Sequence, residues 1–188
     1  FTFSKLIGKC QRINTEMGKM LLFTPHVSFY FASPINDVVE SFANKLMKEK
    51  NLRLGHNSVV VRGIEPVELP VGKTELVVKA QSPIVADSPD GKRRIYHTPF
   101  DDEFYRVLKK NLLYKYETVY GEPYKGELEI EKVDVREHHF KKLFVKTIII
   151  KAWEGSYRIE ASHEMIRLAL EAGLGSKNAQ GFGMALPC

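Results

Sequence analysis

The sequence predicts an α+β protein made of two units, each built from strands and helices in a similar order. After residue 73, strand-like and helix-like segments follow in the order β-α-β-β-α-β. Before residue 70 the order is strand, strand, helix, strand, which is the same kind of unit without its first strand and first helix. The short stretch of residues 70–72 contains proline and glycine, so we expect the boundary between the units there.

Apolar and aromatic runs in the first unit predict strands at residues 1–5, 20–24, 26–33, 52–54 and 58–67. The polar stretch of residues 8–19 is expected to be a loop or the tip of a hairpin. Apolar side chains at helical spacing predict a helix over residues 37–49, with Asn36 or Asp37 as its N-terminal cap. The chain opens at Phe1 on a strand-like alternation and without an initiator methionine, so we expect it to be the remainder of a longer protein.

Apolar runs in the second unit predict strands at residues 74–80, 94–97, 128–135, 143–153 and 182–186. The third and fourth of these are expected to be joined by a polar hairpin, and residues 87–91 are expected to form a turn. Helices are predicted to begin at Asp101 and after Ser162. This order is the ferredoxin-like arrangement, which packs helices on one face of an antiparallel sheet. We therefore expect two ferredoxin-like domains, over residues 1–69 and 74–188.

Composition limits the classes of function. A formal charge of +5 and a pI near 9.1 allow an anionic partner without requiring one. No apolar run approaches the length that spans a membrane. The cysteines, Cys10 and Cys188, lie at opposite ends and have neither metal-ligand spacing nor the pattern of a disulfide framework. We expect a cytoplasmic protein with no cofactor and no metal site.

Two groups of basic residues suggest a polyanion as that partner. The larger group lies between residues 132 and 151 and contains Lys132, Arg136, Lys141, Lys142, Lys146 and Lys151, with His138 and His139 at the predicted hairpin tip. The smaller group is the run of residues 92–94 after the predicted turn. Either group alone is compatible with an ordinary solvated surface, but the two together with a basic glycine-rich loop favour polyanion binding.

The glycine-rich loop is the segment of residues 173–183, between the last predicted helix and the last predicted strand. Its glycines and an exposed Lys177 are expected to let a phosphate approach the backbone closely. The glycines end a helix instead of beginning one, which excludes a dinucleotide fingerprint and a Walker loop. The alternative is structural: Gly173 or Gly175 ends the helix, and Gly181 and Gly183 allow a tight strand.

The sequence GLGSKNAQGFGM, at residues 173–184, resembles the C-terminal glycine-rich motif of the CRISPR-associated repeat-RNA endoribonucleases, the Cas-six family. The strand and helix pattern is similar to that family from Phe1 to the end. The resemblance implies tandem ferredoxin-like domains of the RAMP type, the first one incomplete. It also implies that single-stranded CRISPR repeat RNA is bound and cut without a metal, by attack of the 2′-hydroxyl on the adjacent phosphate with a histidine as general acid or base, often with a tyrosine and a lysine.

The resemblance and the basic groups together give a set of candidate RNA-binding residues: Gly173, Gly175, Ser176, Lys177, Asn178, Gly181, Gly183, Lys141, Lys142, Arg136, Arg93 and Arg94. No catalytic residue is assigned, because the family's histidine belongs to a segment expected before Phe1. None of the six histidines matches it: His26, His56, His97, His138, His139 and His163. Two alternatives stay open, a relative that binds repeat RNA without cutting it and a ferredoxin-like regulatory domain that binds a small anion. Homodimerisation and contacts with other CRISPR effector proteins also stay open.

Overall fold

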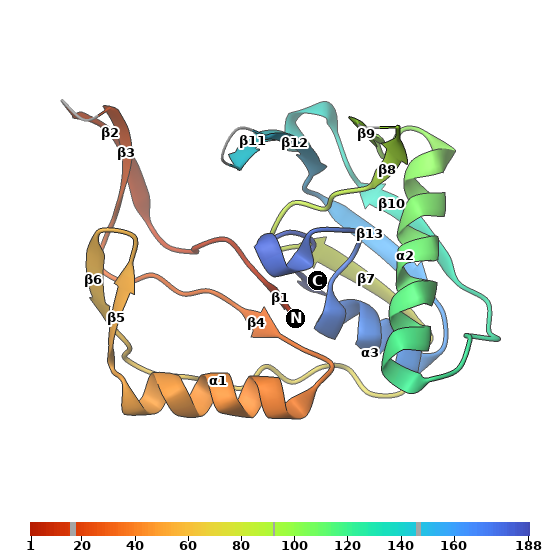
Figure 1. Cartoon of the computed structure of the whole chain (residues 1–188), viewed down its shortest axis with the longest axis horizontal. Helices are drawn as coiled ribbons and strands as arrows, with labels where there is room; N and C mark the ends of the chain where they lie inside the picture. The colour runs from red at the N-terminus through yellow and green to blue at the C-terminus, as the bar shows by residue number, and fades with distance from the viewer. Residues whose placement is uncertain (16–17, 92, 146–147) are drawn as a thin grey trace.

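The computed structural model describes residues 1–188 except 16–17, 92 and 146–147. The second unit is built on a four-stranded antiparallel sheet with the strand order β10-β13-β7-β14. These strands are β7 (Glu75–Ala80), β10 (Glu129–Asp134), β13 (Ser156–Glu160) and β14 (Ala185–Pro187). With helices α2 (Asp102–Tyr120) and α3 (His163–Ala172) between them, the order is that of a complete ferredoxin-like unit, which confirms the predicted fold class (Figure 1).

The two helices form where the sequence predicts them, for the predicted reasons. Helix α2 follows Asp101 and buries Phe104, Leu108 and Leu112, which share one face at helical spacing. Helix α3 is capped by Ser162, whose side chain accepts a hydrogen bond from the backbone N–H of Met165 at 3.3 Å. Both helices contribute to the core that covers the sheet.

The expected pairing of strands 128–135 and 143–153 is wrong. The partner of β10 in the sheet is β13, a short strand in which buried residues alternate with partly exposed ones. The apolar run up to Trp153 instead forms a separate hairpin of β11 (Phe140–Val145) and β12 (Ile148–Trp153), after the short 3-10 helix η1 (Glu137–His139). The predicted turn at residues 87–91 is also mostly strand: β8 (Asp87–Asp90) pairs with β9 (Arg93–Tyr96) around a tight turn at Gly91.

The first unit contains the predicted helix but less strand than expected. Helix α1 (Asn36–Lys48) follows Ile35 with no side-chain cap, so the capping role of Asn36 or Asp37 is wrong. The remaining elements are β1 (Thr2–Phe3), β4 (Phe31–Ala32) and the hairpins β2 (Cys10–Thr15) with β3 (Gly18–Phe23) and β5 (Asn51–Leu54) with β6 (Asn57–Val60). Residues 8–19 are expected to be a loop or the tip of a hairpin, and a hairpin is present there, with longer strands than expected. Residues 61–67, expected to continue a strand, are irregular.

Strand β1 lies against the second unit. It pairs with β4, while the Thr2 hydroxyl donates to the carbonyl of Phe182 at 3.1 Å and the Ser82 hydroxyl donates to the carbonyl of Phe3 at 3.2 Å. Strands β6 and β7, on either side of the predicted boundary, belong to different sheets. The division into domains 1–69 and 74–188 itself stays a prediction. Over the described residues, no helix is both long and apolar enough to cross a membrane.

Candidate nucleic-acid interface

The glycine-rich loop joins α3 to β14 and includes the 3-10 helix η2 (Asn178–Gln180). Its glycines adopt positive φ angles and three of them, Gly173, Gly175 and Gly183, are buried. A Cβ atom added at Gly175 or Gly183 would lie closer than 3.0 Å to the backbone carbonyl oxygen of Val85 or Leu174, respectively. At Gly181 it would meet the Phe3 ring at 2.7 Å. The close backbone approach at these glycines is therefore an approach of the chain to itself.

A lysine of α2 binds several groups of this loop. Lys115 Nζ donates to the carbonyls of Gly173 at 2.7 Å and Gly175 at 3.0 Å, and to Asn178 Oδ1 at 2.8 Å. The Asn178 amide in turn donates to the carbonyls of Leu174 and Phe182, so it joins the two ends of the loop. Burial lowers the pKa of Lys115 to about 7, because it disfavours the charged form. The three acceptors around Nζ act in the opposite direction, because the ammonium has three N–H donors to offer them. Lys115 is thus a structural centre of the loop.

Asp87 ties the loop to the β8–β9 hairpin. Its fully buried carboxylate accepts from Lys177 Nζ at 2.9 Å, from Arg94 Nε at 2.8 Å and from the Ser176 hydroxyl. Burial by itself would raise the pKa of Asp87, but the hydrogen bonds from Arg94, Lys177 and Ser176 outweigh it and hold the pKa at about 2. The expected exposure of Lys177 is wrong, because its side chain is only 21% exposed and its ammonium forms an ion pair with Asp87.

A small apolar cluster attaches the second hairpin to the same place. Ile150 and Ala152 of β12 pack with Val85 and Phe182, and Tyr96 of β9 packs against them. The glycine-rich loop and the hairpins β8–β9 and β11–β12 are therefore connected to one another. In Figure 1 the two hairpins are at the top of the second unit and the dark blue loop lies below them. The sequence placed basic groups on each of these elements, and the fold brings the elements together.

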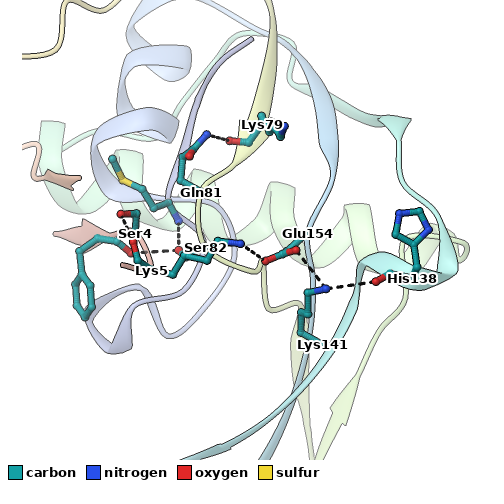
Figure 2. A network of polar contacts seen from close by, with 10 residues as sticks. Ser4, Lys5, Lys79, Gln81, Ser82, His138, Lys141 and Glu154 are labelled. Carbon is teal, nitrogen blue, oxygen red and sulfur yellow. Dashed lines mark hydrogen bonds and ion pairs between the residues drawn. The ribbon is translucent and has the colours of Figure 1, made fainter. Parts of the chain in front are cut away.

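The cations of the β11–β12 region differ in how free they are. Lys141 forms an ion pair with Glu154 at 3.3 Å, and Glu154 also binds Lys5 at 2.7 Å, as Figure 2 shows. Burial acts to raise the pKa of Glu154, but these two lysines outweigh it and lower the pKa. Arg136 is exposed and lies 3.0 Å from Asp134. Lys142 is also exposed, and the predicted basic residues Lys92 and Lys146 lie outside the described part.

Asp87, Lys115 and Glu154 are the site residues that the sequence analysis missed. Lys115 left a signal, because it continues the buried series of Leu108 and Leu112 at helical spacing. Asp87 and Glu154 left none, since Lys177 and Lys5, which bind them, lie far away in the sequence.

In the part of the chain that the structure describes, the histidine side chains contact near neighbours in the sequence. His139 Nδ1 accepts from the backbone N–H of Arg136 at 3.1 Å and its ring lies 4.2 Å from that of His138, while His97 Nε2 is 2.8 Å from the Ser88 hydroxyl. Each of these contacts is local in the sequence. Among the described residues, no group of three or more histidine, cysteine or acidic side chains is placed to hold a metal ion.

The fold and this region define a ferredoxin-like α+β protein with a basic surface around a glycine-rich loop. Comparison with protein families shows which one it is: the family described as CRISPR associated protein Cas6, C-terminal, matches residues 65–186. The family described as CRISPR-associated protein Cas6, N-terminal, matches residues 1–65. The chain belongs to the Cas6 family.

Relatives and solved structures agree with this assignment. The CRISPR-associated endoribonuclease Cas6 1 of Methanocaldococcus jannaschii is 31% identical over 99% of this chain and 72% of its own length. The CRISPR-associated endoribonuclease Cas6 of Pyrococcus furiosus is 26% identical over 83% of this chain, which covers 58% of that relative. A solved structure described as an RAMP protein binding different RNA substrates is 26% identical with a TM-score of 0.84, over 100% of this chain and 78% of its own.

Proposed function

We propose that this chain binds single-stranded CRISPR repeat RNA on the surface formed by the glycine-rich loop and the hairpins β8–β9 and β11–β12. The observation that supports this most strongly is that Asp87 and the Val85–Phe182 cluster join three separately predicted basic elements into one region. Because the elements are adjacent, one RNA strand can contact all of them, and each phosphate contact then contributes to the affinity. Relatives of the chain are named CRISPR-associated endoribonucleases, which supports RNA as the ligand.

The reaction that we propose for the protein is cleavage of precursor CRISPR RNA by the 2′-hydroxyl next to the scissile phosphate. This attack forms a 2′,3′-cyclic phosphate and expels the 5′-oxygen, so it needs a base, an acid and charge stabilisation. We assign none of the six histidines to these roles. A chain that binds repeat RNA without cutting it is the alternative, and cleavage of repeat RNA by the chain in EDTA would exclude that alternative.

Direct phosphate contacts are proposed for three exposed cations, Arg93 and Lys142 on the hairpins and Arg136 just before η1, together with the half-buried Lys141. The candidate residues of the loop, from Gly173 to Gly183, and Arg94 would instead shape the surface, because their polar groups already bind within the protein.

The test neutralises two exposed cations on different hairpins. Lys141 is unsuitable, because a change there also disturbs Glu154 and Lys5. The double variant Arg93→Gln with Lys142→Gln should weaken binding of repeat RNA and flatten the plot of log K against log[salt] by about 1.4, or about 0.7 for each phosphate contact with a single strand.

A matched control is Lys110→Gln with Lys125→Gln, which removes the same charge from exposed positions on α2 and in the loop after it. Fluorescence anisotropy of a labelled repeat RNA at several salt concentrations measures both variants. Equal slopes for the parent and both double variants would contradict the proposed surface.

A further inference from the structure

The β11–β12 hairpin has two faces of different chemistry. Residues directly opposite each other in an antiparallel pair point to the same side, and the pairs alternate between sides. One side contains Ile150 and Ala152, which pack with Val85 and Phe182 inside the protein. The other side contains Phe140, Lys142, Phe144, Ile149, Lys151 and Trp153. None of these six residues is acidic.

Trp153 is buried in the core at one end of this face, and the rest of the face presents aromatic rings and lysines in alternation to solvent. Phe144 is 69% exposed, and Lys142 Nζ lies 5.9 Å from the centre of its ring. Four residues earlier, Phe140 packs on Trp153 with 5.2 Å between ring centres. Trp153 in turn meets Phe100 at 5.4 Å, and Lys132 Nζ lies 4.6 Å from the Phe100 ring. The aromatic-basic strip, as we call it, comprises Phe144, Lys142, Phe140, Phe100 and Lys132.

We propose that the aromatic-basic strip binds unpaired nucleobases of the RNA by stacking, with the lysines on the flanking phosphates. The inference rests on the proposed function and specifies which part of the RNA this surface recognises. Phe140 and Phe144 are about 13 Å apart along the strand, from a rise of about 3.3 Å per residue, which leaves Lys142 between two stacked bases. Stacking tolerates any base, because every base has a π-face.

The charge on the strip favours RNA over a protein partner. The cores of protein interfaces are enriched in aromatic residues but depleted in lysine, because burying its charge is costly. Here Lys142 lies between the two phenylalanines and Lys151 lies opposite it, so a protein covering the rings would also bury lysines. A single strand of RNA instead brings a phosphate for each base, and each lysine then has an anionic partner.

Phe144→Ala in the 188-residue chain tests the strip, with Ile148→Ala as the matched control. Ile148 is 61% exposed and also lies near the end of the hairpin, but it points to the other side. The probes are a single-stranded CRISPR repeat RNA and an abasic ribose-phosphate oligonucleotide of the same length. Phe144→Ala should weaken binding of the RNA about tenfold, leave the salt slope unchanged and have no effect on the abasic probe. Ile148→Ala should bind both probes like the parent, and Phe144→Tyr should keep the parent affinity.

Four outcomes would overturn the inference, and they are distinguishable. If the parent binds the RNA and Phe144→Ala binds it equally well, the strip is wrong while the proposed function stands. If Phe144→Ala loses affinity equally for both probes, the contribution of Phe144 is not base stacking. If Phe144→Ala changes only the oligomeric state, measured by light scattering, the strip is a protein interface. A parent that binds neither probe overturns the proposed function and the strip with it.

Discussion

The glycine-rich loop and the β11–β12 hairpin are both predicted to meet RNA, but their polar groups are arranged in opposite ways. In the loop, the lysine ammonium and the carbonyls are bound within the protein, to Asp87 and to Lys115. On the outward face of the hairpin, Lys142 and Lys151 extend into solvent beside exposed rings. The loop is therefore built as a support, and the hairpin offers the groups that an RNA strand needs.

The difference shows what a glycine-rich motif indicates. Glycine permits close backbone approach, but the approaching group is the chain's own carbonyl at Gly175 and Gly183. The structural alternative from the sequence thus explains these two glycines, and the motif marks the place where loop, helix and hairpins are assembled. Substitutions in the two regions should accordingly affect different properties, stability in the loop and RNA affinity in the hairpin.

The largest effect is expected at Gly183. Alanine there would bring Cβ against the carbonyl of Leu174 at a positive φ of 74°, so the free energy of unfolding should fall by more than about 3 kcal/mol. Gly63→Ala is the control, because nothing lies within 4 Å of its Cβ position. Urea unfolding measures both variants, and equal midpoints would show that the loop relaxes without cost.

Lys115→Met should be the next most damaging change. Methionine fills similar space but leaves the carbonyls of Gly173 and Gly175 and the Asn178 side chain without their common donor, at a cost of about 3 kcal/mol. Lys110→Met, at an exposed position of the same helix, should change stability by less than about 0.5 kcal/mol. If the two variants unfold at the same urea concentration, Lys115 does not support the loop.

Asp87→Asn should reduce stability at neutral pH, because it removes the buried charge that pairs with Arg94 and Lys177. The expected loss is limited to about 2 kcal/mol, because Arg94 is 45% exposed and water screens part of its ion pair. The parent should also be sensitive to acid. The pKa of Asp87 is lowered to about 2 from an ordinary 3.8, so its contribution is present above about pH 4 and is lost as the pH falls toward 2.

The variant should lack this part of the pH dependence, which thermal unfolding between pH 2 and 7 measures. An unchanged difference in melting temperature between parent and Asp87→Asn across this range would assign the acid sensitivity to other carboxylates.

Much of the fold was predictable because local signals agree with the tertiary structure. The helical spacing of Phe104, Leu108 and Leu112 and the cap at Ser162 required no knowledge of distant residues. Strand pairing was less accessible: the apolar run ending at Trp153 conceals two strands, and β13 is short. Register depends on long-range partners, which periodicity alone does not reveal.

For the candidate site, the sequence located the basic elements but not their state. Lys177 and Arg94 look like free cations in the sequence, and only the fold brings both to Asp87. The residues DSPDG at 87–91 resemble a turn, which concealed the buried role of the first aspartate. The alternation of rings and lysines on one face of β11 also needed the register with β12 to become visible.

The comparison between loop and hairpin is tested most directly by the salt dependence of RNA binding in two single variants, Lys142→Ala and Lys177→Ala. Both remove one positive charge, but the first lysine is exposed and the second is paired with Asp87. Lys142→Ala should flatten the plot of log K against log[salt] by about 0.7, and Lys177→Ala should leave the slope of the folded protein unchanged. The opposite result, a flatter slope for Lys177→Ala and the parent slope for Lys142→Ala, would contradict the account and return the phosphate contact to the loop.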